Sequence, residues 1–167
     1  TAQDILEFDA YCAERNIELV PSVATFGHLY KVLRTKTFHE LSEVEEAEGT
    51  AFSFYERMCH HTLNSTDDRA YELVCRLIDE YSPLFRSNLF NINCDETFDL
   101  GRGRGKERAD EIGSHVMYVQ WVNRVCEHVK ALGKRPMFWG DIIAAHPEAI
   151  KELPEDVICM TWDYSPT

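Results

Sequence analysis

The sequence predicts an α/β fold in which parallel strands alternate with helices. Short apolar runs of strand length recur along the chain, and every connection between two of them contains a stretch with helical periodicity. That alternation requires parallel strands covered by helices. At 167 residues, with 44% hydrophobic and 28% charged residues, the chain is about one domain long and can bury a core.

The first third of the chain contains one helix, one strand and a long connection. A helix is predicted over 2–15, where apolar residues recur at helical spacing. It leads into an apolar run with β-branched residues at 17–23, which predicts a buried strand. Residues 24–68 are polar and irregular, with short helices expected near 38–48 and 52–60. Connections of that length are usually functional.

The rest of the chain alternates helical stripes with strand-length runs, bounded by residues that cap or end helices. The expected elements are a helix capped by Asp67 and Asp68 and ended by Pro83, a strand at 89–94, a long helix carrying an apolar stripe from Ile112 to Leu132 and closed by Gly133, a strand at 136–141, a helix at 147–153 and a strand at 157–162.

Two folds contain such an alternation, a doubly wound sheet and a (β/α)8 barrel. A doubly wound nucleotide binder has a glycine-rich turn directly after its first strand, whereas Gly101–Gly105 comes well after the second and matches neither the dinucleotide fingerprint nor a P-loop. A complete barrel takes about 250 residues. We therefore expect a partial TIM (β/α)8 barrel of about four consecutive parallel strands with their helices. Residues 1–167 would be a single fragment from the middle to later half of such a catalytic domain.

Barrel chemistry lies at the carboxyl ends of the strands, and this chain has a notable residue at each one. The candidates are His28 beyond the first strand, Asp95 and Glu96 ending the second, Trp139 and Asp141 ending the third, and Trp162 and Tyr164 ending the fourth. Carboxyl groups can cleave a glycoside, and indole rings suit the apolar face of a sugar. The pattern predicts a carbohydrate site. Adjacent strand residues point to opposite faces, so Asp95 and Glu96 can serve one ligand only if the backbone bends.

Charge and composition exclude other classes of partner. The net charge of −12 disfavours binding to nucleic acid or to an anionic membrane surface, and no apolar run approaches the length of a membrane span. The basic residues cluster once, among the glycines of 101–108, which indicates an ordered loop or a solvated turn. The 6 cysteines are widely spaced without a CxxC pair, so free thiols and a cytoplasmic, reducing compartment are favoured.

Several other candidates have simpler structural interpretations, and no cofactor is expected. Cys59, His60 and His61 suggest a metal site, but adjacent histidines point apart on a helix and no acidic partner stands at zincin spacing. Asp99 is expected to brace the glycine-rich loop, and Trp121 to serve packing. The acidic run of Glu43, Glu45, Glu46 and Glu48 indicates a solvated face.

Three segments together resemble one known family. They are Asn91-Ile-Asn-Cys-Asp-Glu-Thr-Phe-Asp-Leu-Gly101, Met137-Phe-Trp-Gly-Asp141 and the stretch from Ile17 to His28 that ends in Gly-His. In this order they resemble glycoside hydrolase family 20, the β-N-acetylhexosaminidases. The resemblance covers essentially the whole chain.

The resemblance implies retaining hydrolysis in which the substrate's own acetamido oxygen is the nucleophile, an exception to the two-carboxylate scheme. On matching motif positions, Glu96 would be the general acid and base, and Asp95 would orient the acetamido group. Trp139 and Trp162 would wall the acetamido pocket, with Tyr164 as a hydrogen-bonding candidate. Glu96 must be protonated in the resting complex, so its pKa should be raised.

The sequence departs from the family pattern in two respects. The family motif has a histidine and two glycines before the acidic pair, where this chain has Asn91, Asn93 and Cys94. An arginine by which family members grip sugar hydroxyls comes from an early strand that this chain does not contain. These departures motivate one alternative, a non-catalytic carbohydrate-binding or scaffold module. A further alternative is a retaining glycosidase of another barrel family with a carboxylate nucleophile.

A half barrel also has consequences for assembly. Its two outer strands would expose unpaired edges, which are a hazard for pairing between chains. The excised chain is therefore expected to form a homodimer through these edges, or to cover them with its long loop.

Overall fold

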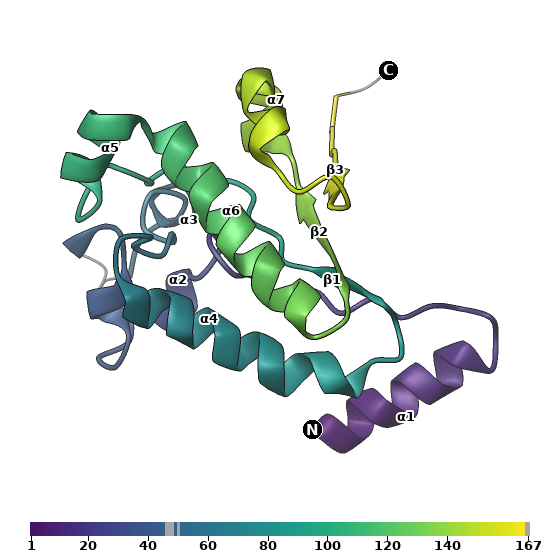
Figure 1. The fold of residues 1–167 in the computed structure, drawn as a ribbon. Coiled ribbons are helices and arrows are strands. Elements are labelled where there is room, and N and C mark those ends of the chain that lie inside the picture. The colour runs from purple at the N-terminus through teal and green to yellow at the C-terminus, as the bar shows by residue number, and fades with distance from the viewer. Residues whose placement is uncertain (46–48, 50, 166–167) are drawn as a thin grey trace.

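A computed structural model of the protein describes residues 1–45, 49 and 51–165 as helices packed on a small parallel sheet (Figure 1). The elements in chain order are α1 (Ala2–Ala13), α2 (Tyr30–Leu33), the 3-10 helix η1 (His39–Leu41), α3 (Phe54–Arg57), α4 (Asp68–Tyr81), η3 (Ser82–Leu84), β1 (Leu89–Asn91), α5 (Lys106–Ile112), α6 (Ser114–Ala131), β2 (Arg135–Trp139), α7 (Asp141–Ala145), η4 (Pro147–Glu152) and β3 (Ile158–Met160).

The sheet keeps the order of the chain. β1, β2 and β3 pair in parallel in that order, with Asn91 opposite Met137 and Trp139 opposite Met160. A helix-containing connection precedes each strand that joins the sheet. The predicted α/β class with consecutive parallel strands is confirmed by this topology.

The prediction of a first strand at 17–23 is wrong. Within the described residues this segment forms only an isolated parallel bridge, between Ser22 and Asn91. Asn91 donates its N–H to the Pro21 carbonyl at 2.9 Å, and Val23 donates to the Asn91 carbonyl at 3.0 Å. Pro21 has no N–H to continue a ladder, and Ile17 is exposed, so the run is neither regular nor fully buried. It nevertheless lies beside β1, next to the sheet.

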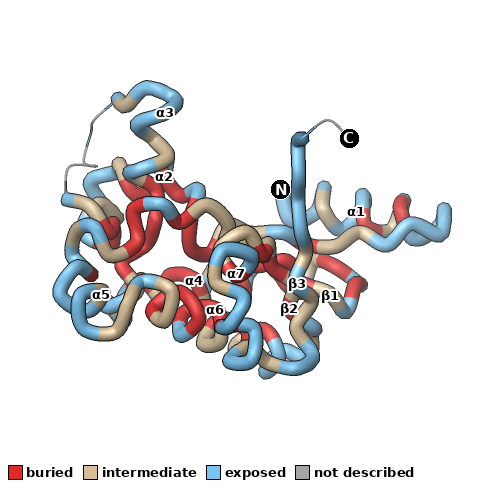
Figure 2. Tube along the Cα trace, turned by 90° about the horizontal axis from the view of Figure 1, so that it is seen from above, coloured by how far each residue is buried: buried red, intermediate tan, exposed pale blue. Residues whose placement is uncertain are grey.

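The core lies between the sheet and the two long helices. α4 and α6 pack against each other, and α6 also contacts β2 (Figure 1). Phe90 of β1 and Phe138 of β2 are fully buried, whereas Trp139, the next residue along β2, is only partly buried. In the tube view, buried chain gathers around α4, α6 and β1, while α1 and the end of the chain are largely exposed (Figure 2). One face of the sheet is therefore covered more completely than the other.

The predicted helices lie where the sequence places them, but several differ from the predictions in length. Asp67 caps α4 as predicted, by accepting from the N–H of Arg69. The predicted long helix is interrupted at Gly113, whose φ of 90° separates α5 from α6. The predicted helix near 38–48 is a 3-10 turn at its start, and its residues 46–48 lie outside the described part of the chain. Among the helices in the described ranges, none is long and apolar enough to cross a membrane.

Candidate active site

The backbone bends where β1 ends, and this bend brings two carboxylates together. Asn93, Cys94 and Glu96 have φ angles of 57°, 68° and 53°, in the left-handed region that most residues avoid. Asp95 and Glu96 consequently do not alternate across the sheet as they would on a regular strand. The bend that the paired carboxylates required is present.

His28 connects the two carboxylates. Its Nε2 lies 3.2 Å from Oδ2 of Asp95 and 3.3 Å from Oε2 of Glu96. His28 comes from the loop after the Ser22 bridge and itself has a φ of 61°. Neighbouring Gly27 is tightly enclosed, because a Cβ added there would lie 2.4 Å from the Asp95 carbonyl oxygen. A close approach of the two loops therefore sets the position of His28.

The electrostatics of this cluster favour a protonated Glu96. Burial raises the pKa of Glu96, the positive charge of His28 lowers it, and the negative charges of Asp95 and Asp141 raise it further, with a net upward shift. The hydrogen bond with Asp95 raises the pKa of His28. Both shifts are upward, so the cluster favours the protonated forms of Glu96 and His28.

Asp141 lies behind the pair. It begins α7, and its Oδ2 accepts a hydrogen bond from the backbone N–H of Glu96 at 3.0 Å. Burial raises the pKa of Asp141, and its other oxygen, Oδ1, is buried without a hydrogen-bond partner. Sequence reasoning placed Asp141 at the rim as a substrate ligand, whereas the structure shows its side chain holding the Glu96 backbone.

His61 and Asp99 support the cluster from the other side. The ring of His61 lies edge-on to that of His28, with 4.9 Å between ring centroids, and its Nε2 is 2.8 Å from the Glu96 carbonyl. Asp99 is fully buried, and its side chain accepts from the N–H groups of His61 and Thr62 and from the Thr62 hydroxyl. Asp99 thus braces the segment around His61, whereas the sequence predicted that it would brace the glycine-rich loop.

A hollow of about 290 Å³ opens over the carboxylates. Six of the seven predicted site residues line it: His28, Asp95, Glu96, Trp139, Trp162 and Tyr164. The side chains of Asp95 and Glu96 are 18% and 24% exposed, so both reach the hollow from a largely enclosed position. The structure brings these six predicted residues together. The seventh, Asp141, does not line the hollow but binds the backbone N–H of Glu96.

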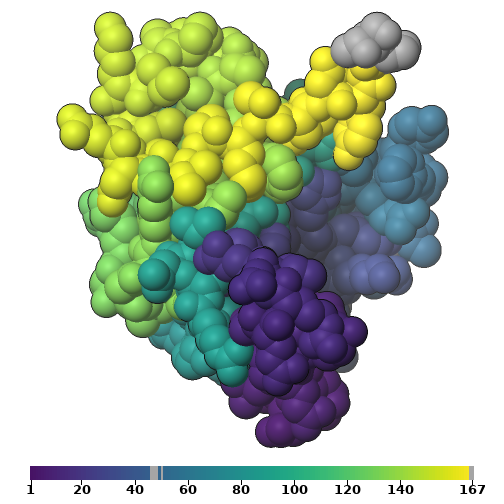
Figure 3. Space-filling view, turned by 90° about the vertical axis from the view of Figure 1, so that its right-hand side faces the viewer, coloured from purple at the N-terminus to yellow at the C-terminus, as the bar shows by residue number. Residues whose placement is uncertain are grey.

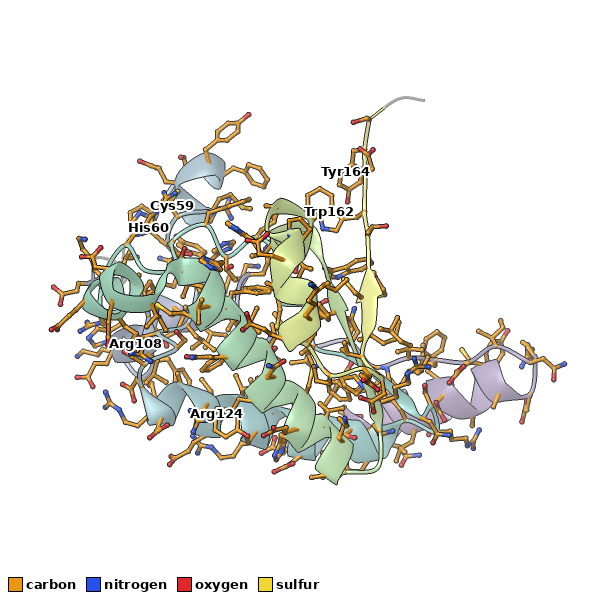
Figure 4. All side chains as sticks on the ribbon, turned by 45° about the horizontal axis from the view of Figure 1, so that its top comes forward. Cys59, His60, Arg108, Arg124, Trp162 and Tyr164 are labelled. Atoms are coloured by element: carbon orange, nitrogen blue, oxygen red, sulfur yellow. The ribbon has the colours of Figure 1, made fainter. Side chains whose placement is uncertain are left out.

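The two aromatic residues after β3 form an open wall. Trp162 and Tyr164 extend along the chain beyond β3, with ring centroids 5.6 Å apart (Figure 4). Trp162 is 38% exposed and Tyr164 90% exposed. Seen from that side, the end of the chain and residues near 50–60 flank a recess whose floor comes from earlier segments (Figure 3). The hollow is accessible to a ligand.

The same cluster contains groups that could bind a metal ion. One ligand atom from each of His28, Asp95 and Glu96 falls within 4.8 Å of the others. These are the residues that the described chain offers for such a site, and sequence reasoning looked instead at Cys59 and the adjacent histidines. His60, labelled in Figure 4, stacks on Phe52 with ring centroids 3.8 Å apart. The His61 ring contacts the Glu96 carbonyl instead, so the adjacent histidines have different partners.

The prediction of a solvated acidic face is wrong for Glu43. This residue is fully buried, and its Oε1 accepts hydrogen bonds from the N–H groups of Gly103 and Gly105 at 3.0 and 2.9 Å. Burial raises the pKa of Glu43, partly offset by these hydrogen bonds. Glu45 is exposed as predicted, and Glu46 and Glu48 lie outside the described residues. Glu43, and not Asp99, holds the glycine-rich loop.

A larger cavity of about 510 Å³ lies away from the carboxylates, at the start of α4 and along α5 and α6. Its walls include Arg104, Arg108 and Arg124, the last two labelled in Figure 4. Each of these arginines has a carboxylate partner, at 3.4, 2.5 and 2.8 Å respectively. None of the predicted site residues lines this cavity. We therefore take the hollow above Asp95 and Glu96 as the candidate active site.

Comparisons with known proteins point to one family. The family model described as "Glycosyl hydrolase family 20, catalytic domain" matches residues 1–166. Hexosaminidase D of Homo sapiens is 30% identical over 158 residues, covering 89% of this chain and 30% of that protein. Beta-hexosaminidase of Vibrio furnissii is 23% identical over 174 residues, covering 97% of this chain and 26% of that protein. The chain therefore spans about a third or less of the length of these relatives.

Solved structures show the same fold. The X-ray structure of Flavobacterium johnsoniae chitobiase superposes with a TM-score of 0.77 at 23% identity, covering 98% of this chain and 24% of that one. A mutant Streptomyces plicatus beta-hexosaminidase in complex with its product, GlcNAc, gives a TM-score of 0.70 at 21% identity, covering all of this chain and 29% of that one. The described residues thus reproduce one part of these larger chains.

Proposed function

The chain belongs to glycosyl hydrolase family 20, and from that premise we propose that it is the acid-bearing part of a β-N-acetylhexosaminidase catalytic domain. The full domain would remove terminal β-linked N-acetylhexosamine by substrate-assisted hydrolysis with retention. The observation that carries the proposal is the hollow in which Asp95, Glu96 and the Trp139 indole meet.

The first step needs an acid and an internal nucleophile. Glu96 gives its proton to the glycosidic oxygen, and the alcohol leaves. The acetamido carbonyl oxygen attacks the anomeric carbon as that bond breaks, which forms an oxazolinium ion. The Asp95 carboxylate accepts from the acetamido N–H and stabilises the positive charge that spreads over the ring. The raised pKa of Glu96 supports its role as the proton donor.

The second step reverses the proton transfer. The Glu96 carboxylate removes a proton from water, whose oxygen attacks the anomeric carbon and opens the oxazolinium ring. The acetamido group is regenerated and the configuration is retained. His28 contacts both carboxylates, so its positive charge would moderate the change of charge on Glu96 between the two steps.

The partial sheet supports a larger fold. The face of β2 that bears Trp139, and the whole of β3, are only partly buried or exposed, whereas parallel sheets are normally covered on both faces. We propose that residues 1–167 complete a (β/α)8 barrel together with further strands. The chain excised from its parent would pair through its uncovered edges, which light scattering of the isolated chain tests.

Dependence on the acetamido group tests the proposed reaction. The full-length protein should hydrolyse 4-nitrophenyl N-acetyl-β-D-glucosaminide and leave the matching β-D-glucopyranoside nearly untouched, because the glucoside carries no nucleophile. Comparable turnover of both would refute acetamido participation and favour a carboxylate nucleophile. Binding of N-acetylglucosamine without turnover of either substrate would indicate the non-catalytic carbohydrate module.

A further inference from the structure

Asn93 occupies a backbone position that ordinarily suits glycine. Its φ of 57°, like the 68° of neighbouring Cys94, lies in the left-handed region, where a side chain is disfavoured. The Cys94 side chain is buried and contacts the Thr25 hydroxyl. The Asn93 side chain takes a different direction, toward the indole of Trp139.

Three donors meet the side-chain oxygen of Asn93. Its Oδ1 lies 3.1 Å from the indole Nε1 of Trp139 and 3.2 Å from both the Ser22 hydroxyl and Nδ2 of Asn91. These donors come from β2, from the Ser22 bridge and from β1. One amide oxygen therefore joins three neighbouring segments at the carboxyl end of the sheet.

Two hydrogen bonds to the Asn93 backbone also hold this network in place. Asn91 fixes the loop by accepting from the Asn93 backbone N–H at 3.0 Å, and Trp139 donates its own backbone N–H to the Asn93 carbonyl at 2.9 Å. An indole has a single polar donor, so a hydrogen bond to that N–H fixes the rotation of the ring about its side-chain torsion. Held in this orientation, the Trp139 ring lines the hollow beside Asp95 and Glu96.

We propose that Asn93 is a positioning residue that sets the plane of the Trp139 indole, and through it the fit of the N-acetyl group of the sugar. The inference rests on the proposed function for the identity of the ligand, and on the hydrogen bonds alone for the orientation of the ring. Its consequence is that the side chain at position 93 tunes selectivity for the 2-acetamido substituent while touching no part of the proton-transfer machinery.

The variant Asn93→Gly removes the amide without straining the backbone, since glycine suits this φ. Asn16→Gly is the matched control, because it makes the same substitution at an exposed asparagine with a left-handed φ of 56°, just after α1 and away from Trp139. In the full-length protein, Asn93→Gly should lower kcat/KM for 4-nitrophenyl N-acetyl-β-D-glucosaminide about five- to tenfold, the usual effect of one lost hydrogen bond, mainly through KM. Asn16→Gly should stay within about twofold.

A spectroscopic readout reports the ring directly. In protein labelled with 5-fluorotryptophan, the 19F signal of Trp139 is identified by its disappearance in Trp139→Phe. Asn93→Gly should shift or broaden that signal, whereas Asn16→Gly should leave it in place. Because both changes break the same hydrogen bond, the kinetic effects of Asn93→Gly and Trp139→Phe should be less than additive.

The outcomes separate the two proposals. If the parent protein hydrolyses neither substrate, the proposed function fails, and the fluorine signal still decides whether Asn93 holds the ring. If the Trp139 signal is the same in Asn93→Gly, Asn16→Gly and unaltered protein, the positioning role is refuted. Equal kinetic losses in the two glycine variants would refute it as well, since they would reflect loosening of the backbone alone.

Discussion

Nε2 of His28 lies 3.3 Å from Oε2 of Glu96, a residue 68 positions further along the chain and beyond the long helix α4. This contact makes the protonation of the proposed catalytic acid depend on a residue from another loop. The positive charge of His28 lowers the pKa of Glu96, against the larger effect of burial that raises it.

Removal of His28 should therefore shift the pH dependence of hydrolysis. Glu96 must be protonated to act, so activity falls as the pH rises through its raised pKa. In His28→Gln the moderating charge is absent and the pKa of Glu96 rises further, which moves the alkaline limb of the kcat/KM profile to higher pH. A limb that moves to lower pH in His28→Gln would contradict this electrostatic relationship.

Gly27 should not tolerate a side chain. A Cβ would lie 2.4 Å from the Asp95 carbonyl oxygen, so Gly27→Ala must displace the backbone of the acidic pair. Displacement of about 1 Å at reacting groups can cost about 100-fold in rate, and we expect kcat/KM to fall at least tenfold. Gly133→Ala is strained by its φ of 75° but meets no atom within 4 Å, so it controls for a destabilising glycine replacement away from the site. Normal activity in Gly27→Ala would show that the loops can separate without consequence.

Asp99 should matter for stability more than for chemistry. Asp99→Ala leaves the buried N–H groups of His61 and Thr62 without their acceptor. At about 1 to 3 kcal/mol for each unsatisfied group, the free energy of unfolding should fall by about 2 kcal/mol or more. Asp110→Ala, at an exposed carboxylate, is the comparison. Urea unfolding measures both, and equal midpoints would show that Asp99 is not a brace.

Glu43 predicts a pH-dependent stability. Burial raises its pKa in the folded protein above the ordinary value of 4.5. Its contribution to stability is therefore complete at pH values below 4.5 and is lost as the pH rises through the folded pKa. The Glu43→Gln variant lacks this dependence. As the pH rises from acidic to neutral, its unfolding midpoint should therefore increase relative to that of the unaltered protein.

Glu45→Gln controls for the loss of one negative charge from the same segment, because this carboxylate is 75% exposed. A difference between the Glu43→Gln variant and unaltered protein that stays constant from acidic to neutral pH would contradict the raised pKa. An unfolding midpoint of Glu43→Gln that decreases relative to that of the unaltered protein over this pH range would contradict it as well.

Local signals in the sequence account for the class of fold. The apolar stripe and caps of α4 and the strand-length runs at β1 and β2 are encoded within each segment, so periodicity finds them. The bridge at Ser22 depends on a partner distant in sequence, whereas the break at Gly113 has a local cause, a glycine with a φ of 90°. Pro21 signals a weak strand only once its neighbour Asn91 is known.

The same distinction holds at the site. Asp95, Glu96 and the tryptophans follow strands, so their meeting could be expected from topology. The roles of Asp141 and Glu43 could not, because each carboxylate binds backbone N–H groups 45 to 62 residues away. The left-handed turn at Asn93 and Cys94 could not be predicted either, since neither residue is the glycine that usually signals such a turn.

The most direct test of the central claim is the hydrolysis of N,N′-diacetylchitobiose by the full-length protein and its Glu96→Gln variant, with Glu45→Gln as control. A natural sugar leaving group needs the proton that Glu96 supplies, so the variant should lose about 100-fold or more in kcat, and less with a nitrophenyl leaving group. Turnover of the disaccharide at the unaltered rate in Glu96→Gln would show that this carboxyl group is not the acid, and the account would fail.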